Sequence, residues 1–415
     1  MKDNAIRPVH RDGASTPGIL FVYDSLRIGG CERVISVLAR EFSQRNFAVT
    51  ILMIKKNKVE FELPDSVKVL SFEDFPKRAC ISPERVLMWG KLTCSKLTCA
   101  LAVLFRRKNQ DCFLTKDARM EMYRLYVRYC GFMRQCFRQH PDDTIISFMD
   151  NPNFATILAS RGLPNRVIIS ERNHPGRDNV QPHILRYRNR LYSRADRIVF
   201  QTAEERDYYP EDIRRKGVLI ENPISEHLPE PSWGERTKEI VTFCRLDRQK
   251  NLIGLIRSFC RIKERYIGYD LVIYGKGNQE ELIRRYIEEN NLSERVFLRP
   301  YDENVHRQVL DAAMFVSFSD YEGISNSMLE AMAIALPVIC TDCPAGGAKL
   351  MIESGTNGLL VPVGDEEAMA NAIAYCIDHP EIARAMGRKA AEIRNRYNVA
   401  EIASQWIKVV LNGSS

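Results

Sequence analysis

The stretch 315–337, FVSFSDYEGISNSMLEAMAIALP, constrains the fold of this chain more than any other. It begins with an alternating apolar run that predicts a buried strand, passes through a polar loop, and continues as a segment rich in Met, Leu and Ala that predicts a helix. Ser327 with Glu330 three residues later has the form of a capping box, and Asn326 or Ser325 could cap the helix instead. Ligands of open parallel sheets bind at such strand ends, where the next helix offers free N–H groups to an anion. We therefore expect a binding site at this loop.

Two carboxylates flank the loop, Glu322 and Glu330. They would repel a phosphate unless they face the neutral hydroxyls of a sugar or a ribose, which donate hydrogen bonds to carboxylates. In the alternative interpretation, Glu330 is only a capping residue and Glu322 is a solvated loop acid. The spacing alone favours neither. A metal site formed by Asp320 and Glu322 is a minority interpretation.

The spacing Glu-x7-Glu, together with Pro337-Val338 and NGLLVPVGD at 357–365, resembles the signature of family 4 retaining glycosyltransferases of the two-Rossmann-domain (GT-B) type. The resemblance implies that Glu322 holds the sugar ring of a nucleotide-activated donor and that Glu330 holds its ribose. By the same resemblance, three loop residues border the donor: Gly323, Ile324 and Ser325.

Length and composition indicate a large globular protein. The chain has 415 residues, of which 45% are hydrophobic, enough for two or three domains. Residues 1–17 are polar, lack the apolar core of a signal peptide and are expected to form a flexible tail. The longest apolar run, 97–105, is too short to span a bilayer. We therefore expect a cytoplasmic protein whose twelve cysteines are reduced.

A glycine pair follows the first predicted strand, 18–23. Gly29 and Gly30 precede an apolar helical pattern, so they could bring the backbone close to a phosphate, or they could merely form a tight turn. The sequence Gly29-Gly30-Cys31-Glu32 resembles the GGxE element of the same family, which lines the cleft that faces donor and acceptor.

The segment 77–140 is strongly basic. It contains fourteen Lys and Arg against four Asp and Glu, a net charge of +10, whereas the whole chain has a net charge of +7. Because apolar and aromatic residues alternate with these cations, an anionic membrane surface is the favoured partner. A solvated basic face is the main alternative. Nucleic acid is less favoured, since no nucleic-acid-binding motif is present.

A polar cluster ends the predicted strand 166–170: Glu171, Arg172, Asn173 and His174. It resembles an element in which family members carry a histidine that contacts the donor sugar, and Arg172 occupies that position here. Glu171 and His174 remain candidates. The strand 197–200 is predicted to be the last of the first domain, and Glu221-Asn222-Pro223 resembles the family's interdomain hinge.

The second half of the chain begins a new strand and helix pattern at 239–243. Arg245 and Lys250 lie five residues apart across one short loop, so they could converge on a diphosphate, or they could belong to a solvated turn. The loop resembles the family's GRLxxxKN element, with Cys244 in place of the glycine. The resemblance also places three further residues beside the nucleotide: Gly275, Gly277 and Arg299.

We therefore predict two facing Rossmann-like α/β domains. The expected boundaries are a tail at 1–17, an acceptor-binding domain at 18–222 with the basic insert 77–140, a nucleotide-sugar-binding domain at 223–395, and a helix at 396–415 that crosses back to the first domain.

The resemblance implies a retaining enzyme that transfers a hexose or N-acetylhexosamine from a UDP-sugar to a glycan, on a polyprenyl-diphosphate carrier at the inner face of the plasma membrane. GGAK at 346–349 resembles an element of N-acetylhexosamine transferases. Glu322, Arg245, Lys250 and Arg172 are the expected catalytic residues, with no metal ion and no cofactor. The alternatives are an epimerase of nucleotide sugars and a noncatalytic scaffold of the same fold.

Overall fold

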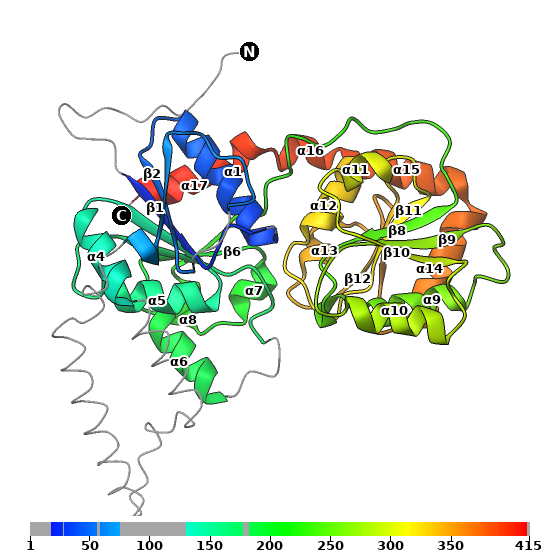
Figure 1. The fold of residues 1–415 in the computed structure, drawn as a ribbon, viewed down its shortest axis with the longest axis horizontal. Helices are drawn as coiled ribbons and strands as arrows, with labels where there is room; N and C mark the ends of the chain where they lie inside the picture. Colours follow the sequence, from blue (N-terminus) through cyan, green and yellow to red (C-terminus); the bar gives the residue numbers. More distant parts are fainter. Residues whose placement is uncertain (1–17, 28, 56–58, 75–129, 177–181, 413–415) are drawn as a thin grey trace, which may run out of the picture.

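A computed structural model describes residues 18–27, 29–55, 59–74, 130–176 and 182–412. In this part of the chain, two sheets lie side by side, and helices cover both faces of each (Figure 1). The predicted class, two facing Rossmann-like α/β domains, is confirmed.

The sheet of the first domain has seven parallel strands in the order β3-β2-β1-β4-β5-β6-β7. The strands are β1 (Ile19–Tyr23), β2 (Val49–Met53), β3 (Val67–Ser71), β4 (Thr144–Phe148), β5 (Val167–Ser170), β6 (Arg197–Phe200) and β7 (Gly217–Leu219). Every residue of β2 and β4 is buried, as expected for strands covered on both faces.

The sheet of the second domain has six parallel strands in the order β10-β9-β8-β11-β12-β13. The strands are β8 (Glu239–Phe243), β9 (Asp270–Tyr274), β10 (Val296–Arg299), β11 (Met314–Ser317), β12 (Val338–Thr341) and β13 (Leu359–Val361). In each sheet the strand order reverses once, between β1 and β4 and between β8 and β11. Ligands of such sheets bind beside this reversal, at the carboxyl ends of the strands.

The helices fill the connections between strands. Those of the first domain are α1 (Gly30–Gln44), α4 (Gly131–Gln139), α5 (Asp150–Ser160), α6 (Pro182–Tyr192), α7 (Ala203–Asp207) and α8 (Glu211–Arg214). Those that follow are α9 (Leu252–Cys260), α10 (Glu280–Glu289), α11 (Val305–Gln308), α12 (Asn326–Ala333), α13 (Gly347–Met351), α14 (Glu366–Asp378), α15 (Pro380–Ala391), α16 (Ile393–Arg396) and α17 (Val399–Leu411).

The last helix, α17, returns from the second domain and packs on the first beside α1 (Figure 1). Trp406 is completely buried, and its ring centroid lies 5.7 Å from that of Phe148, the last residue of β4. Arg166 donates a hydrogen bond of 2.5 Å to the carbonyl oxygen of Val410 near the end of the helix. The predicted return of the carboxyl-terminal helix to the first domain is therefore confirmed.

One prediction of secondary structure was wrong. The strand 197–200 is not the last of the first domain, because β7 pairs with it in parallel. β7 has only three residues, too few for a clear alternating pattern. The predicted domain boundaries remain predictions, although every strand of the first sheet precedes residue 222 and every strand of the second follows it.

Most of the basic segment 77–140 lies outside the described residues. Its last part forms α4, whose apolar side chains, Phe132, Met133, Cys136 and Phe137, are buried in the first domain. Among the helices that the structure describes, none has the length and apolar character needed to cross a membrane.

The packing of α17 predicts that Trp406→Ala destabilises the protein by about 3–5 kcal/mol, because the substitution leaves a large cavity against the first sheet. Trp233 is 61% exposed. Trp233→Ala is therefore the matched control, with an expected change within about 0.5 kcal/mol. Urea unfolding followed by circular dichroism measures both. Equal stability of the two variants would contradict the proposed role of α17.

Candidate functional site

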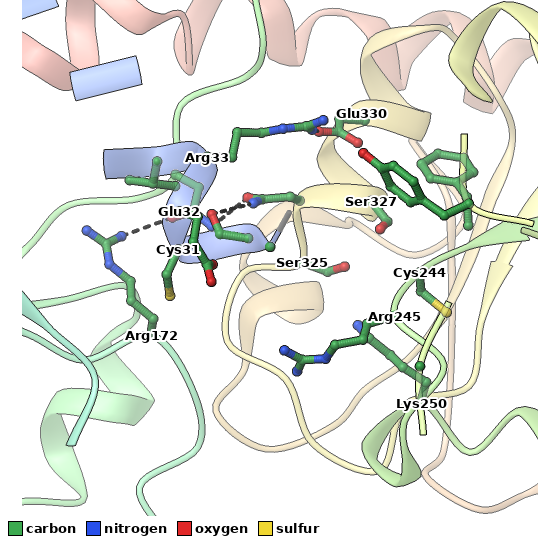
Figure 2. Close-up of a pocket in the computed structure, with 18 of the residues that line it drawn as sticks. Cys31, Glu32, Arg33, Arg172, Cys244, Arg245, Lys250, Ser325, Ser327 and Glu330 are labelled. Atoms are coloured by element: carbon green, nitrogen blue, oxygen red, sulfur yellow. Dashed lines mark hydrogen bonds and ion pairs between the residues drawn. The ribbon is translucent and has the colours of Figure 1, made fainter. Parts of the chain in front are cut away.

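A cavity of about 490 Å³ lies between the two domains, where the strand ends of both sheets meet. Segments that follow β1, β4, β5, β8 and β11 all contribute to it (Figure 2). Eight predicted site residues line it together with Gly29 and Gly30: Arg172, Arg245, Lys250, Gly277, Glu322, Ile324, Ser325 and Glu330. The structure therefore brings into one cavity residues that the sequence places on separate loops.

The glycine pair begins α1 and touches the second domain. A side chain at Gly29 would overlap the carboxylate of Glu32, and one at Gly30 would come within 3.2 Å of the Asn326 amide nitrogen. That nitrogen donates a hydrogen bond of 3.2 Å to the carbonyl oxygen of Gly30. The start of α1 and the start of α12 thus lie against each other at the cavity.

Lys250 and Glu322 form an ion pair at the wall of the cavity. The distance from Lys250 Nζ to Glu322 Oε2 is 2.5 Å, and Gln249 Nε2 donates to the same oxygen at 2.9 Å. Burial is the largest single influence and lowers the pKa of Lys250, but the charge and hydrogen bond of Glu322, together with the charges of Cys244 and Asp247, outweigh burial, so this pKa lies above its ordinary value. Lys250 is therefore a fixed cation at neutral pH.

Arg245 is the more accessible of the two predicted cations. Its side chain is 66% exposed, against 11% for Lys250, and its Nε lies 2.5 Å from Asp247 Oδ2. The loop between them ends in Asn251, which has a φ of 45° and whose side chain accepts a hydrogen bond from the backbone N–H of Gly254 to cap α9. This capped turn sets the direction in which Arg245 and Lys250 leave the backbone.

Helix α12 begins at the cavity, as the sequence predicts, but its cap is Ser325 rather than Ser327. The Ser325 hydroxyl accepts a hydrogen bond from the backbone N–H of Met328. Ser327 lies inside the first turn, so Ser327 and Glu330 do not form a capping box. Glu330 is available for other contacts.

Glu330 is a buried carboxylate shared by both domains. Arg33, from α1, forms an ion pair with Oε1, and His306 Nε2 lies 2.8 Å from Oε2 (Figure 2 shows Arg33 and Glu330). Burial, followed by the charge of Arg33, lowers the pKa of His306 to about 4. At neutral pH the imidazole is uncharged, and because a carboxylate can only accept, Nε2–H must be the donor.

The side chain of Arg172 is buried at the edge of the cavity and is fixed by its neighbours. Its guanidinium carbon lies 5.0 Å from the ring centroid of Phe148 and 5.4 Å from that of Trp406, and Nη1 donates to Asn222 Oδ1 at 2.9 Å. Burial lowers the pKa of Arg172 to about 10, so the group remains charged. Asn222 Nδ2 in turn donates to the Ile324 carbonyl oxygen at 3.0 Å. Arg172 therefore links the hinge to the loop of the second domain.

The two alternatives to Arg172 do not line the cavity. Glu171 is fully buried and accepts a 2.7 Å hydrogen bond from the hydroxyl of Tyr209. His174 packs against the rings of Tyr208 and Tyr321. Both side chains support the loop that carries Arg172.

Three predicted donor-site residues are also absent from the cavity lining. A side chain at Gly275 would overlap the carbonyl oxygen of Cys244, and one at Gly323 would come within 2.9 Å of the carbonyl oxygen of Arg172. These glycines allow close packing of the loops. The guanidinium of Arg299 instead lies over the ring of Phe297, 5.4 Å from its centroid.

Several lining residues were missed from the sequence: Arg33, Asn173, Asn222, Gln249, Lys276 and His306. Gln249 and Asn222 lie inside segments that the family resemblance singled out, so their positions in those motifs could have identified them as site residues. His306 lies in no such motif, and the sequence gives no reason to select it. Among the described residues, no group of three or more His, Cys, Asp and Glu is arranged to hold a metal ion.

Comparison with known proteins shows that this chain is similar to glycosyltransferases. Residues 224–393 match the family described as glycosyl transferases group 1. The chain is 24% identical to a Campylobacter jejuni enzyme, N-acetylgalactosamine-N,N'-diacetylbacillosaminyl-diphospho-undecaprenol 4-alpha-N-acetylgalactosaminyltransferase, over 94% of this chain and 98% of that protein. It is 23% identical, with the same coverage, to a second C. jejuni enzyme, an alpha-1,4-N-acetyl-D-galactosaminyltransferase that acts on a diNAcBac-PP-undecaprenol-linked saccharide.

Solved structures share the two-domain arrangement. TarM of Staphylococcus aureus superposes with a TM-score of 0.73 at 15% identity, over 97% of this chain and 100% of that chain. HepE of Anabaena, solved in complex with UDP, has a TM-score of 0.72 at 16% identity, over 94% of this chain and 99% of that chain. Residues 224–393 are therefore similar to the glycosyl transferases group 1 family, and the chain as a whole has the GT-B fold of two facing Rossmann-like domains.

Proposed function

We propose that this protein transfers a hexose or N-acetylhexosamine from a UDP-sugar to a lipid-linked glycan, with retention of the anomeric configuration and without a metal ion. The observation that carries the proposal is the convergence of Arg245, Lys250, Glu322 and Glu330 on one cavity between two facing sheets. The names of the two C. jejuni relatives support an N-acetylhexosamine and a polyprenyl-diphosphate carrier.

The chemistry proposed for the cavity is stabilisation of the leaving group. When the bond between sugar and phosphate breaks, negative charge grows on the diphosphate. Arg245, Lys250 and the N–H groups at the start of α12 would then interact more strongly with the transition state than with the bound donor. Arg245 can contact the diphosphate with two N–H groups, whereas Lys250 acts as a point charge.

The carboxylates would bind the neutral parts of the donor. Glu330 already accepts from His306 at one oxygen, and its remaining lone pairs could accept the ribose hydroxyls. Glu322, held by Lys250 and Gln249, would accept hydroxyl groups of the sugar ring. In this arrangement neither acid faces the phosphates directly.

A panel of UDP- and GDP-sugars read by mass spectrometry tests the proposed function. We expect loss of sugar from a UDP-N-acetylhexosamine, with transfer to a polyprenyl-diphosphate-linked acceptor. An isomerised donor would instead indicate an epimerase, and binding without turnover would indicate a scaffold. Either result would contradict the proposal.

Glu322→Gln and Lys250→Ala are each expected to reduce turnover by about 10²–10³-fold, because each removes a charge that contacts the reacting donor. Lys408→Ala, at an exposed lysine of α17, is the control and should retain normal activity. Circular dichroism should show unchanged secondary structure in all three variants. Near-normal transfer by both site variants would contradict the assignment of the cavity.

We further propose that the basic segment 77–140 holds the enzyme on an anionic membrane, on the cytoplasmic side. The support is its net charge of +10 with interspersed apolar residues. The protein should sediment with vesicles containing phosphatidylglycerol, but not with phosphatidylcholine alone, and raising the salt to about 0.5 M should release it. Absence of binding to anionic vesicles at low ionic strength would refute this role.

A further inference from the structure

His306 is a histidine of the cavity to which the proposed function assigns no role of its own. It belongs to the short helix α11, which is anchored on either side of His306 by the buried residues Val305 and Val309. His306 is 7% exposed, and its ring lies edge-on to that of Phe243, with 5.3 Å between the centroids and 83° between the planes. Phe243 packs in turn on Phe315. The imidazole therefore has a fixed place and direction.

This fixed imidazole is one of two side-chain partners of Glu330. Nε2 of His306 lies 2.8 Å from Oε2, whereas Arg33 pairs with Oε1. Among the described residues, no other side chain forms a hydrogen bond or ion pair with this carboxylate. His306 belongs to the same domain as Glu330, whereas Arg33 reaches it from α1 of the first domain. Of the two partners, only His306 can hold Glu330 when the domains separate.

The two partners also differ in charge. Burial, followed by the charge of Arg33, lowers the pKa of His306, so the imidazole is neutral at neutral pH and donates through Nε2–H. A neutral donor fixes the direction of Glu330 without cancelling its negative charge. Because hydrogen bonds to an ionised acceptor are stronger than those to a neutral one, Glu330 keeps its capacity to bind hydroxyl groups.

Without His306, Glu330 would have an alternative arrangement. A guanidinium can bind both oxygens of one carboxylate in a two-pronged contact, so both oxygens could turn toward Arg33 and the first domain. With His306 in place, Arg33 and His306 each take one of the roughly four lone-pair positions of the carboxylate. Both oxygens then retain an acceptor position, which suits a pair of neighbouring hydroxyl groups. The ribose of a nucleotide carries such a pair.

We propose that His306 is a positioning residue that directs Glu330 toward the 2′- and 3′-hydroxyls of the donor's ribose and thereby sets the selectivity for a ribonucleotide. This inference rests on the proposed function, which places the ribose at Glu330. Since His306 acts through Glu330, its loss should weaken only the part of the binding that the ribose hydroxyls supply. The contacts of Arg245 and Lys250 with the diphosphate should persist.

His306→Phe tests the proposal, because a ring remains against Phe243 while the hydrogen-bond donor is lost. Calorimetry measures the Kd for UDP and for 2′,3′-dideoxy-UDP. The wild type should bind UDP at least about tenfold more tightly than the dideoxy compound, since the hydroxyls bond to a charged group. In His306→Phe, the Kd for UDP should rise by about tenfold and that for dideoxy-UDP should stay within about twofold, so the preference for UDP is lost.

His306→Gln separates the donated hydrogen bond from packing. Its amide can donate to Glu330 in place of the imidazole, so the preference for UDP should stay within about threefold of that of the wild type. His379→Phe is the matched control, because His379 is an exposed histidine of the same domain and does not line the cavity. It should bind both nucleotides as the wild type does.

Steady-state transfer gives an independent readout. His306→Phe should raise the KM for the nucleotide sugar by about tenfold and change kcat by less than about threefold, because the groups that contact the diphosphate are intact. Circular dichroism checks the folding of each variant. If His306→Phe fails to fold, His306→Ala takes its place, with the same loss of preference expected.

Three results would overturn the inference and leave the proposed function intact, provided that the wild type binds UDP and transfers sugar. The first is an unchanged preference for UDP in His306→Phe or His306→Ala. The second is an equal loss of affinity for both nucleotides, which would indicate a general disturbance of the cavity. The third is a preference in His306→Gln as weak as in His306→Phe.

The wild type alone decides whether the ribose lies at Glu330. If it binds UDP and dideoxy-UDP equally, the ribose does not depend on Glu330, and His306 cannot act through it. If it binds neither nucleotide, the proposed function is refuted together with the role of His306.

Discussion

The site depends on the packing of Trp406 against the first sheet. This residue belongs to α17, which has returned from the second domain, and it contacts Phe148 at the end of β4. Arg172 lies against both rings and donates to Asn222 at the hinge. This buried cluster therefore connects β4 to the two places where the chain passes between the domains, the hinge at Asn222 and helix α17. β4 is the strand next to which the strand order of the first sheet reverses. Through this cluster the strand ends of the two sheets face each other across a single cavity.

Three cations of the cavity are paired with carboxylates before any ligand binds. Lys250 is paired with Glu322, Arg245 with Asp247, and Arg33 with Glu330. Removing such a cation from its partner inside a protein is costly, whereas exchanging one anionic partner for another is much less so. A diphosphate could therefore displace a carboxylate from Arg245 without leaving a bare charge. The pairing also explains how acids and cations remain stable side by side in one cleft.

Local patterns predicted the parts of this arrangement that depend on neighbours in the sequence. The strand, loop and helix around Glu322 and the loop carrying Arg245 and Lys250 are local features, and the parallel-sheet rule brings their ends together. The partners of Glu330 could not be predicted in this way, because Arg33 comes from the other domain and His306 from a separate short helix. Ser325 and Ser327 are equally good caps in sequence, and only the backbone distinguishes them. β7 was missed because its three residues carry no periodic signal.

The contacts that form the cavity are also contacts between the domains. Arg33 reaches Glu330 from α1, and Asn326 at the start of α12 donates to the carbonyl oxygen of Gly30 at the start of α1. Any opening of the cleft must break these two interactions, and both involve groups that face the cavity. A ribose that takes over part of Glu330 would compete with Arg33 for the same carboxylate. If the donor binds as proposed, occupation of the donor site and the relative position of the two domains would be coupled through Glu330.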